Sequence, residues 1–213
     1  MHPTTPRRGT AGDFDRQATA RSSPVHPGHS QMTDPVLPLG DPRLRRLCAP
    51  ILDVHAPSFR RDNERLKKAL DAFRLQYGFG RGIAAPQIGI PSSFISLNLG
   101  AGTRSLVNPV LTWRSPETFT LWDDCMCFPH LLVRLRRHSS VSVEYLDEQG
   151  RPHAWEKLPQ AEAELLQHEL DHLQGVLAID LALDARSIIY RSAFAADPAY
   201  FRSQVDDVIQ PTT

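Results

Sequence analysis

The chain has 213 residues, which suffices for one domain of ordinary size with a hydrophobic core, whereas two domains would be crowded. Apolar residues make up 41% of it and charged residues 23%, as in an average globular protein. The formal net charge is zero, so we expect neither nucleic acid nor an anionic membrane as a partner. No apolar run approaches the roughly 18–20 residues that cross a bilayer. The composition leaves the oligomeric state open.

The three cysteines, Cys48, Cys125 and Cys127, are too few and too irregular for a disulfide scaffold. This favours a reducing compartment, and we expect a cytoplasmic protein. Residues 1–33 lack the apolar core of a secretory signal and are rich in Pro, Ser, Thr and Arg. We expect them to be a disordered extension, with import into an organelle as the alternative, and the folded domain to comprise residues 34–213.

The first predicted helix covers residues 58–77, where apolar side chains recur at helical spacing: Leu66, Ala69, Leu70, Phe73 and Tyr77. The next segment, GRGIAAPQIGIP over residues 80–91, is too rich in Gly and Pro to be regular throughout. Short strands are then predicted over residues 94–97, 106–107, 110–113, 119–127, 131–135 and 141–146.

A second helix is predicted over residues 159–173, because it has a proline at its start, acidic residues in its first turns and Gly175 just past its end. One more helix is predicted over residues 197–209. The order of helix, strands and helix predicts an α+β domain rather than a parallel doubly wound one.

Residues 168–172, His-Glu-Leu-Asp-His, carry the pattern H-E-x-x-H on the second predicted helix. His168 and His172 project from one helix face one turn apart, so both imidazoles can bind one metal ion. Glu169 can take a proton from an activated water molecule and deliver it to a leaving group. The alternative is a surface helix with two incidental histidines.

A catalytic metal ion needs a third protein ligand and one open coordination position. The chain after His172 contains neither His nor Cys, but upstream Cys125 and Cys127 stand close together in DDCMCFP, residues 123–129. A thiolate from this predicted strand would complete a Cys-His-His site suited to Zn²⁺ or Fe²⁺. The alternative for either cysteine is a buried small apolar side chain.

Three segments together resemble the peptide deformylase family, whose motifs are written G-x-G-I/L-A-A-x-Q, E-G-C-L-S and Q-H-E-x-D-H. Here residues 80–87 read GRGIAAPQ, residues 123–127 read DDCMC and residues 167–172 read QHELDH. The first and third match closely, and the resemblance extends over about residues 34–183. It implies a deformylase-like α+β fold in which small, mostly antiparallel sheets pack around a central helix that carries H-E-x-x-H.

The resemblance implies a metal-dependent amidohydrolase that removes the formyl group from the N-terminal, formyl-methionyl residue of peptides and releases formate. The implied metal ligands are Cys125, His168 and His172, since the family's cysteine lies four residues before a proline, here Pro129. We expect one divalent metal ion, natively Fe²⁺, with Zn²⁺, Ni²⁺ or Co²⁺ able to occupy the same site. Glu169 is implied to protonate the departing amine.

Further roles follow from the same resemblance. The Gln87 side chain and the backbone N–H of Met126 are implied to hold the developing oxyanion, a task for preorganised donors. The implied contacts to the substrate are Gly80, Gly82, Ile83, Asp123 and Arg137. For Arg137, a solvated position on the surface is the alternative.

The second motif departs from the family pattern at four positions, because Asp123 replaces Glu, Asp124 replaces Gly, Met126 replaces Leu and Cys127 replaces Ser. Replacement of Leu by Met is mild, since volume and polarity are similar. Asp124 adds a Cβ and a further carboxylate beside the metal ligand. That extra anion is expected to raise the pKa values of the ligand and of water at the site.

Glu164 is a second departure. It lies four residues before His168 on the metal-binding face of the helix, where the resemblance implies an apolar pocket for a methionine side chain. One hypothesis turns Glu164 toward solvent. The other makes it a substrate-binding residue that reshapes the pocket for a polar or cationic substrate.

Two other functions remain as alternatives. The first is a divergent deformylase or deacylase that acts on a specialised N-formylated small molecule or an atypical peptide, as the altered second motif and Glu164 indicate. The second is an inactive homologue that binds peptides, which is disfavoured because every implied catalytic position is filled. An ordinary zinc endopeptidase is disfavoured further, since its downstream ligand is missing.

Overall fold

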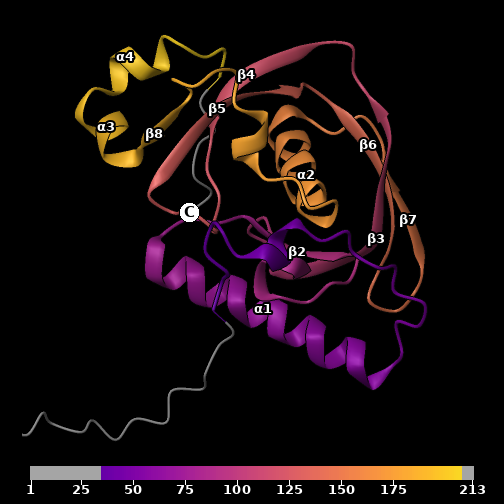
Figure 1. Cartoon of the computed structure of the whole chain (residues 1–213). Coiled ribbons are helices and arrows are strands. Elements are labelled where there is room, and N and C mark those ends of the chain that lie inside the picture. The colour runs from indigo at the N-terminus through magenta and orange to yellow at the C-terminus, as the bar shows by residue number, and fades with distance from the viewer. Residues whose placement is uncertain (1–34, 208–213) are drawn as a thin grey trace, which may run out of the picture. The chain divides into compact units, whose positions relative to one another are not determined.

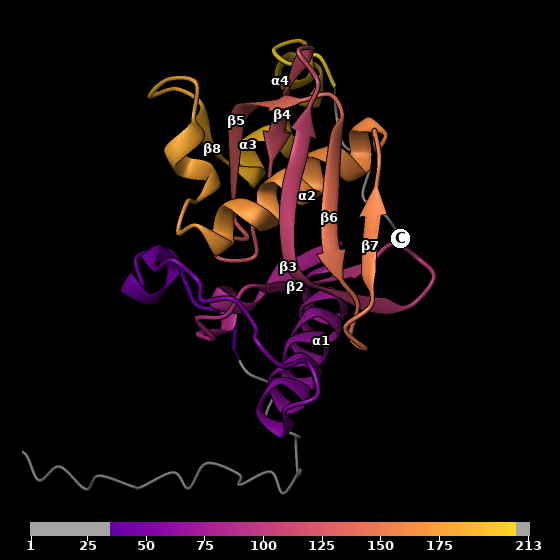
Figure 2. The same cartoon turned by 90° about the vertical axis from the view of Figure 1, so that its right-hand side faces the viewer.

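The computed structural model describes residues 35–207, so the N-terminal extension expected over residues 1–33 lies outside the described part. The described residues form an α+β domain, which confirms the fold class expected from the sequence. Helix α2 lies between two antiparallel sheets of five and three strands (Figures 1 and 2). Helix α1 packs on the other side of the five-stranded sheet, against β1, β2 and β3. No helix within this range is long and apolar enough to cross a membrane.

The helices are α1 (Pro57–Tyr77), α2 (Gln160–Leu173), α3 (Arg191–Ala196) and α4 (Pro198–Arg202), with 3₁₀ turns at Pro42–Arg45, Ala85–Ile88 and Ala178–Leu181. The five-stranded sheet has the order β1-β2-β3-β6-β7, formed by Gly82–Ala84, Phe94–Asn98, Thr103–Arg114, Val141–Leu146 and Pro152–Trp155. The three-stranded sheet has the order β4-β5-β8, formed by Thr118–Asp123, Leu131–His138 and Ile188–Tyr190. Neighbouring strands in both sheets are antiparallel.

Both long helices begin and end within one residue of their predicted bounds, because local signals fix their ends. Helix α1 ends at Gly78, whose φ of 74° is left-handed and whose N–H donates to the carbonyl oxygen of Arg74. Pro159 stands at the N-cap of α2, where its fixed φ suits the start of a helix.

Strands β1, β7 and β8 are missing from the sequence prediction, and two of the predicted regions differ from the observed strands. The strands expected over residues 106–107 and 110–113 are one strand, β3, with an irregular register at Asn108, whose φ is 50°. The strand expected over residues 119–127 ends at Asp123, because the chain turns at once and the Phe128 N–H donates to the Cys125 carbonyl oxygen at 3.1 Å. Cys125 therefore projects from a turn, and its prediction as a strand residue is wrong.

The helix predicted over residues 197–209 is also wrong for the described residues. Instead, α3 ends at Ala196 and α4 starts at Pro198, whose missing N–H cannot continue a helix. The Asp197 side chain accepts the backbone N–H of Tyr200 at 3.1 Å and so starts the new helix. Helix α4 ends at Arg202, and residues 208–209 lie outside the described range.

The hydrophobic core surrounds α2 and supports the inner face of α1. Leu166, Leu170 and Leu173 of α2 belong to one buried cluster with residues of the five-stranded sheet, such as Ile95 and Leu106. Because apolar side chains anchor α2, its buried polar side chains are held at fixed positions between the two sheets.

Leu70→Ala is expected to destabilise the domain by about 2–5 kcal/mol, because it leaves a cavity in a close-packed core. Leu70 is 0% exposed, whereas Leu75 on the same helix is 90% exposed. Leu75→Ala is therefore the matched control, expected to change the free energy of unfolding by less than about 0.5 kcal/mol. Urea denaturation measures both variants, and equal losses would contradict the packing described for α1.

Candidate metal centre

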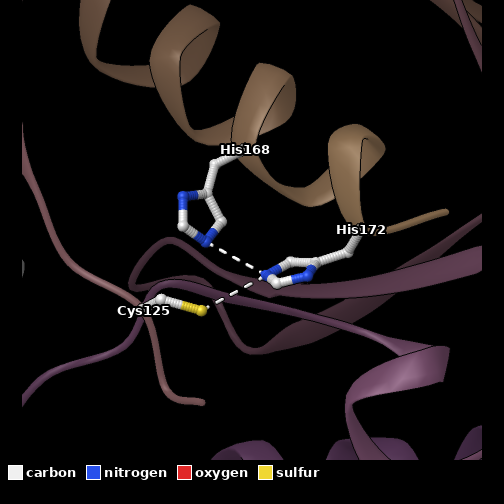
Figure 3. A group of neighbouring side chains, drawn as sticks. All are labelled: Cys125, His168 and His172. Atoms are coloured by element: carbon white, nitrogen blue, oxygen red, sulfur yellow. Dashed lines mark hydrogen bonds between the residues drawn. The ribbon is translucent and has the colours of Figure 1, made fainter. Parts of the chain in front are cut away.

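Three side chains that can bind a metal ion meet between α2 and the turn after β4. The Cys125 Sγ atom lies 3.4 Å from Nε2 of His172, and the Nε2 atoms of His168 and His172 are 3.2 Å apart (Figure 3). The three ligand atoms all lie within 4.8 Å of one another, and all three residues are buried. One thiol and two imidazoles that converge in this way form a donor set suited to Zn²⁺ or Fe²⁺.

Asp123 orients the ring of His168, and burial keeps the imidazole of His172 neutral. The Oδ2 atom of Asp123 lies 3.0 Å from Nδ1 of His168, which directs Nε2 of that ring toward Cys125 and His172. Burial works against protonation of His168, but the Asp123 carboxylate raises the pKa of its imidazole to about 9. Burial and the nearby His168 ring lower the pKa of His172, which favours the neutral imidazole that binds metals.

The raised pKa of the Cys125 thiol is also consistent with a nearby cation. Burial raises the pKa of the Cys125 thiol well above its usual value, and the neighbouring Cys127 raises it further. A thiolate at this position therefore requires a positive charge close to it. Among residues 35–207, the buried Oε2 atom of Glu169 has no hydrogen-bond partner, and it stays available to a ligand in the cavity that Glu169 lines.

Gln87 directs its amide N–H groups at the two thiols. The Oε1 atom accepts the backbone N–H of Ala84 at 2.7 Å, which fixes the orientation of the amide. The Nε2 atom then lies 3.8 Å from Sγ of Cys125 and 3.6 Å from Sγ of Cys127. The side chain is buried, so this donor is oriented in advance of any ligand.

Glu169 lies beside Cys125, His168 and His172 and is 3% exposed. Burial raises the pKa of its carboxyl to about 7, although the His168 ring works in the opposite direction. A carboxyl group with a pKa near neutrality can both take and return a proton. Gly82 makes room for it, since a Cβ at this position would lie 2.8 Å from the Oε1 atom of Glu169.

A cavity of about 300 Å³ opens next to these residues. Most of the residues expected at the site line it, namely Gly80, Gly82, Gln87, Asp123, Cys125, Met126, Glu164, His168 and Glu169. Ile83, expected to contact the substrate, does not line the cavity, because its side chain is fully buried in the core beneath α1.

Arg137 is placed differently from both of its predicted positions. It is 4% exposed and does not line the cavity, so neither a substrate-facing nor a solvated guanidinium is correct. Its Nη2 donates to Asp123 at 3.1 Å and its Nη1 donates to Asp171, so two carboxylates compensate the buried charge. Asp123 lines the cavity, but its Oδ2 atom already forms hydrogen bonds with Arg137 and His168.

Glu164 does not turn toward solvent, so the first of the two hypotheses for it is wrong. The residue is 2% exposed, lines the cavity and forms an ion pair with Arg81 from the loop before β1. Burial raises the pKa of the Glu164 carboxyl to about 7, although the Arg81 charge lowers it. The guanidinium also donates to the carbonyl oxygen of Ala161 at 2.8 Å, which ties it to the first turn of α2.

Several residues at the site are missing from the sequence predictions. Asp171 occupies a conspicuous place between the two histidines, and its spacing from His168 could have indicated a supporting role. Arg81 stands between two glycines of the first motif, where nothing in the local pattern indicates a partner. No sequence signal marks the apolar lining residues or those that follow β8: Phe79, Leu121, Trp122, Leu132, Leu165, Arg191, Phe194, Ala195 and Arg202.

Comparison with known proteins identifies relatives along most of the domain. The family model described as polypeptide deformylase matches residues 33–186. A peptide deformylase of Thermotoga maritima is 33% identical over 154 residues, which are 71% of this chain and 88% of that protein. A peptide deformylase of Treponema pallidum is 33% identical over 144 residues, 67% of this chain and 83% of that protein.

Solved structures agree with the sequence comparison. The crystal structure of the Thermotoga maritima peptide deformylase superposes with a TM-score of 0.65 and 30% identity, over 72% of this chain and 99% of that one. A peptide deformylase from Synechococcus elongatus, solved in complex with actinonin, has a TM-score of 0.67 and 25% identity, over 88% of this chain and 97% of that one.

Arg137→Ala is expected to destabilise the domain by about 3–5 kcal/mol, because it leaves the buried Asp123 carboxylate without the guanidinium that compensates its charge. Arg136, its neighbour on β5, is exposed and bonds only to the Thr118 hydroxyl among the described residues. Arg136→Ala is the matched control, expected to change the free energy of unfolding by less than about 0.5 kcal/mol. Urea denaturation with a chelator present separates this effect from metal binding, and similar losses in both variants would refute a structural role for Arg137.

Proposed function

The chain belongs to the peptide deformylase family, and we propose that it hydrolyses N-formyl peptides with Cys125, His168 and His172 as metal ligands and Glu169 as general acid and base. The family is one of metal-dependent hydrolases that remove the formyl group from the N-terminus of peptides. One observation carries the assignment of the residues: three buried ligand atoms converge beside a buried carboxylate that lines the cavity.

The three ligands would hold a divalent metal ion, whose Lewis acidity activates water and polarises the formyl carbonyl. Glu169 takes a proton from the attacking water and delivers it to the amide nitrogen. The bond between the formyl carbon and this nitrogen then breaks, formate leaves, and the peptide keeps a free amine. The acid and base roles thus fall to one carboxyl group, whose pKa near 7 suits both.

Two donors are proposed to stabilise the oxyanion that forms on the formyl group. The first is the Gln87 amide, which Ala84 holds with its N–H groups directed at the thiols. The second is the backbone N–H of Met126, the residue that follows the cysteine ligand. Each such donor contributes roughly 3–4 kcal/mol to the transition state in related hydrolytic sites.

The resident metal and the compartment belong to the same proposal. We propose Fe²⁺ as the native ion, with Zn²⁺, Ni²⁺ or Co²⁺ able to replace it, since one thiolate and two imidazoles accept each of these. We further propose a cytoplasmic protein, because the three cysteines are free and a thiolate ligand needs a reducing environment. The catalytic domain is proposed to comprise residues 34–213.

Glu169→Ala is expected to lower the rate of formate release from formyl-Met-Ala-Ser by at least about 100-fold, because general acid–base catalysis is lost. Metal content, determined on protein purified anaerobically, should remain unchanged, since Glu169 is not a proposed ligand. Glu162→Ala on the same helix is the matched control and should retain activity. Activity retained without Glu169, or metal lost with it, would contradict the assigned role.

A divergent substrate is the second candidate, and one observation favours it. The Arg81–Glu164 ion pair lies in the wall of the cavity, where an apolar lining would suit a methionine side chain. A paired carboxylate and guanidinium offer hydrogen bonds to a polar side chain instead. This candidate keeps the hydrolysis of a formamide and changes the first residue of the substrate.

The double variant Arg81→Leu/Glu164→Leu tests this candidate without leaving a buried unpaired charge. If the ion pair selects a polar first residue, the ratio of kcat/KM for formyl-Met over formyl-Lys peptides should rise about tenfold. A ratio unchanged from the wild type would exclude a role of the pair in specificity.

A further inference from the structure

One wall of the cavity comes from a segment that the family match does not include. The match ends at residue 186, whereas Arg191, Phe194, Ala195 and Arg202 also line the cavity. These residues belong to α3 and α4, which lie together beside β4 and β5, away from β6 and β7 (Figure 1). Part of the substrate-binding surface is thus built by residues 191–202.

The segment is fixed to the three-stranded sheet at several points. Strand β8 leads into it and pairs with β5. The Trp122 Nε1–H group donates to the carbonyl oxygen of Phe201 at 2.9 Å, and the two rings meet edge to face with centroids 5.6 Å apart. The Asp206 carboxylate accepts both the N–H and the hydroxyl of Thr120 at 2.8 Å. These contacts hold the wall in one position against β4.

An ion pair joins this wall to the turn that carries the cysteine ligand. The Nη2 atom of Arg191 donates to Asp124 at 2.8 Å, and its Nε donates to the carbonyl oxygen of Pro129 at 3.1 Å. The same guanidinium lies over the Phe79 ring, 4.5 Å from its centroid. Because the side chains of Asp124 and Arg191 are 40% and 38% exposed, the pair adds little stability, and its effect is to orient the wall.

Exposure separates an inner from an outer end of the cavity. Leu121, Glu164 and Leu165 are buried, whereas Phe194 is half-buried and Ala195 is exposed. A formylated first residue enters the cavity, but the rest of the peptide has to leave it toward solvent. The peptide therefore passes the outer end, which residues 191–202 help to form.

We propose that Phe194 contacts an apolar side chain of the substrate downstream of its formylated residue, and that Arg191 positions this wall through Asp124. The inference rests on the proposed function and extends it to a substrate class, formylated peptides with apolar residues at the second and third positions. Phe194 is a specificity-determining residue in this account, and Arg191 is a positioning residue.

The test compares formyl-Met-Leu-Leu with formyl-Met-Gly-Gly in the metal-loaded full chain. The wild type should prefer the leucine peptide, and Phe194→Ala should lower the ratio of the two kcat/KM values about tenfold, through KM. Phe194→Leu, which keeps an apolar side chain, should lower it less. Trp113→Ala is the matched control, because Trp113 is an exposed aromatic residue of β3 that does not line the cavity, and should leave the ratio unchanged.

The outcomes separate this inference from the proposed function. A wild type that hydrolyses neither peptide would refute the function itself. A wild type that hydrolyses both without preference, or an unchanged ratio in folded Phe194→Ala and Phe194→Leu proteins, would overturn the inference alone. Thermal unfolding establishes that each variant is folded.

The ion pair between Asp124 and Arg191 is tested separately. Arg191→Asp should lower the preference for the leucine peptide, because it places two carboxylates together and displaces the wall. The double variant Asp124→Arg/Arg191→Asp restores opposite charges and should recover part of the preference. A purely structural role would lower kcat on both peptides equally, and absence of any recovery would overturn the positioning role.

Discussion

The buried guanidinium of Arg137 connects the two parts of the chain that carry the proposed metal ligands. It bonds to Asp171 on α2 and to Asp123 at the end of β4, and Asp123 in turn bonds to Nδ1 of His168. Relative to apolar packing, buried ion pairs seldom add net stability. The benefit lies in orientation, since a planar guanidinium with two carboxylates fixes the angle of the His168 ring. The turn with Cys125 follows Asp123 directly, so the same contacts set its position relative to α2.

The charged residues that depart from the family motifs occur in pairs. Asp124, where the motif has glycine, pairs with Arg191, and Glu164 pairs with Arg81. In each pair one partner comes from a segment that carries a proposed metal ligand, and the other from a surrounding element. Unpaired carboxylates close to the ligands would oppose the formation of anionic groups there. Their pairing explains how the site accommodates additional acids.

The sequence predicts those parts of the site that depend on local spacing. Histidines four residues apart share a helix face wherever the helix packs, so His168, His172 and Glu169 follow from the pattern alone. Contacts between residues far apart in sequence cannot be predicted from local spacing. Arg137 alternates with Arg136 on β5, and only the tertiary structure shows which of the two points inward.

The same limit applies to the fold. Both long helices are predictable from periodicity and end signals, whereas strands β1, β7 and β8 have only three or four residues each and weak patterns of their own, so their pairing with neighbouring strands decides them. The outer wall at α3 and α4 is likewise determined by tertiary contacts, such as the one between Trp122 and Phe201. Sequence patterns therefore do not predict that α3 and α4 form part of the cavity wall.

The central claim is that Cys125, His168 and His172 hold the metal ion, although a second thiol, that of Cys127, lies near Gln87 as well. X-ray absorption spectroscopy at the metal edge, on protein purified anaerobically, tests it most directly. The account predicts one sulfur and two imidazole nitrogens around the metal, with the sulfur signal retained in Cys127→Ser and lost in Cys125→Ser. Two sulfurs in the wild type, or a sulfur signal that depends on Cys127, would contradict it.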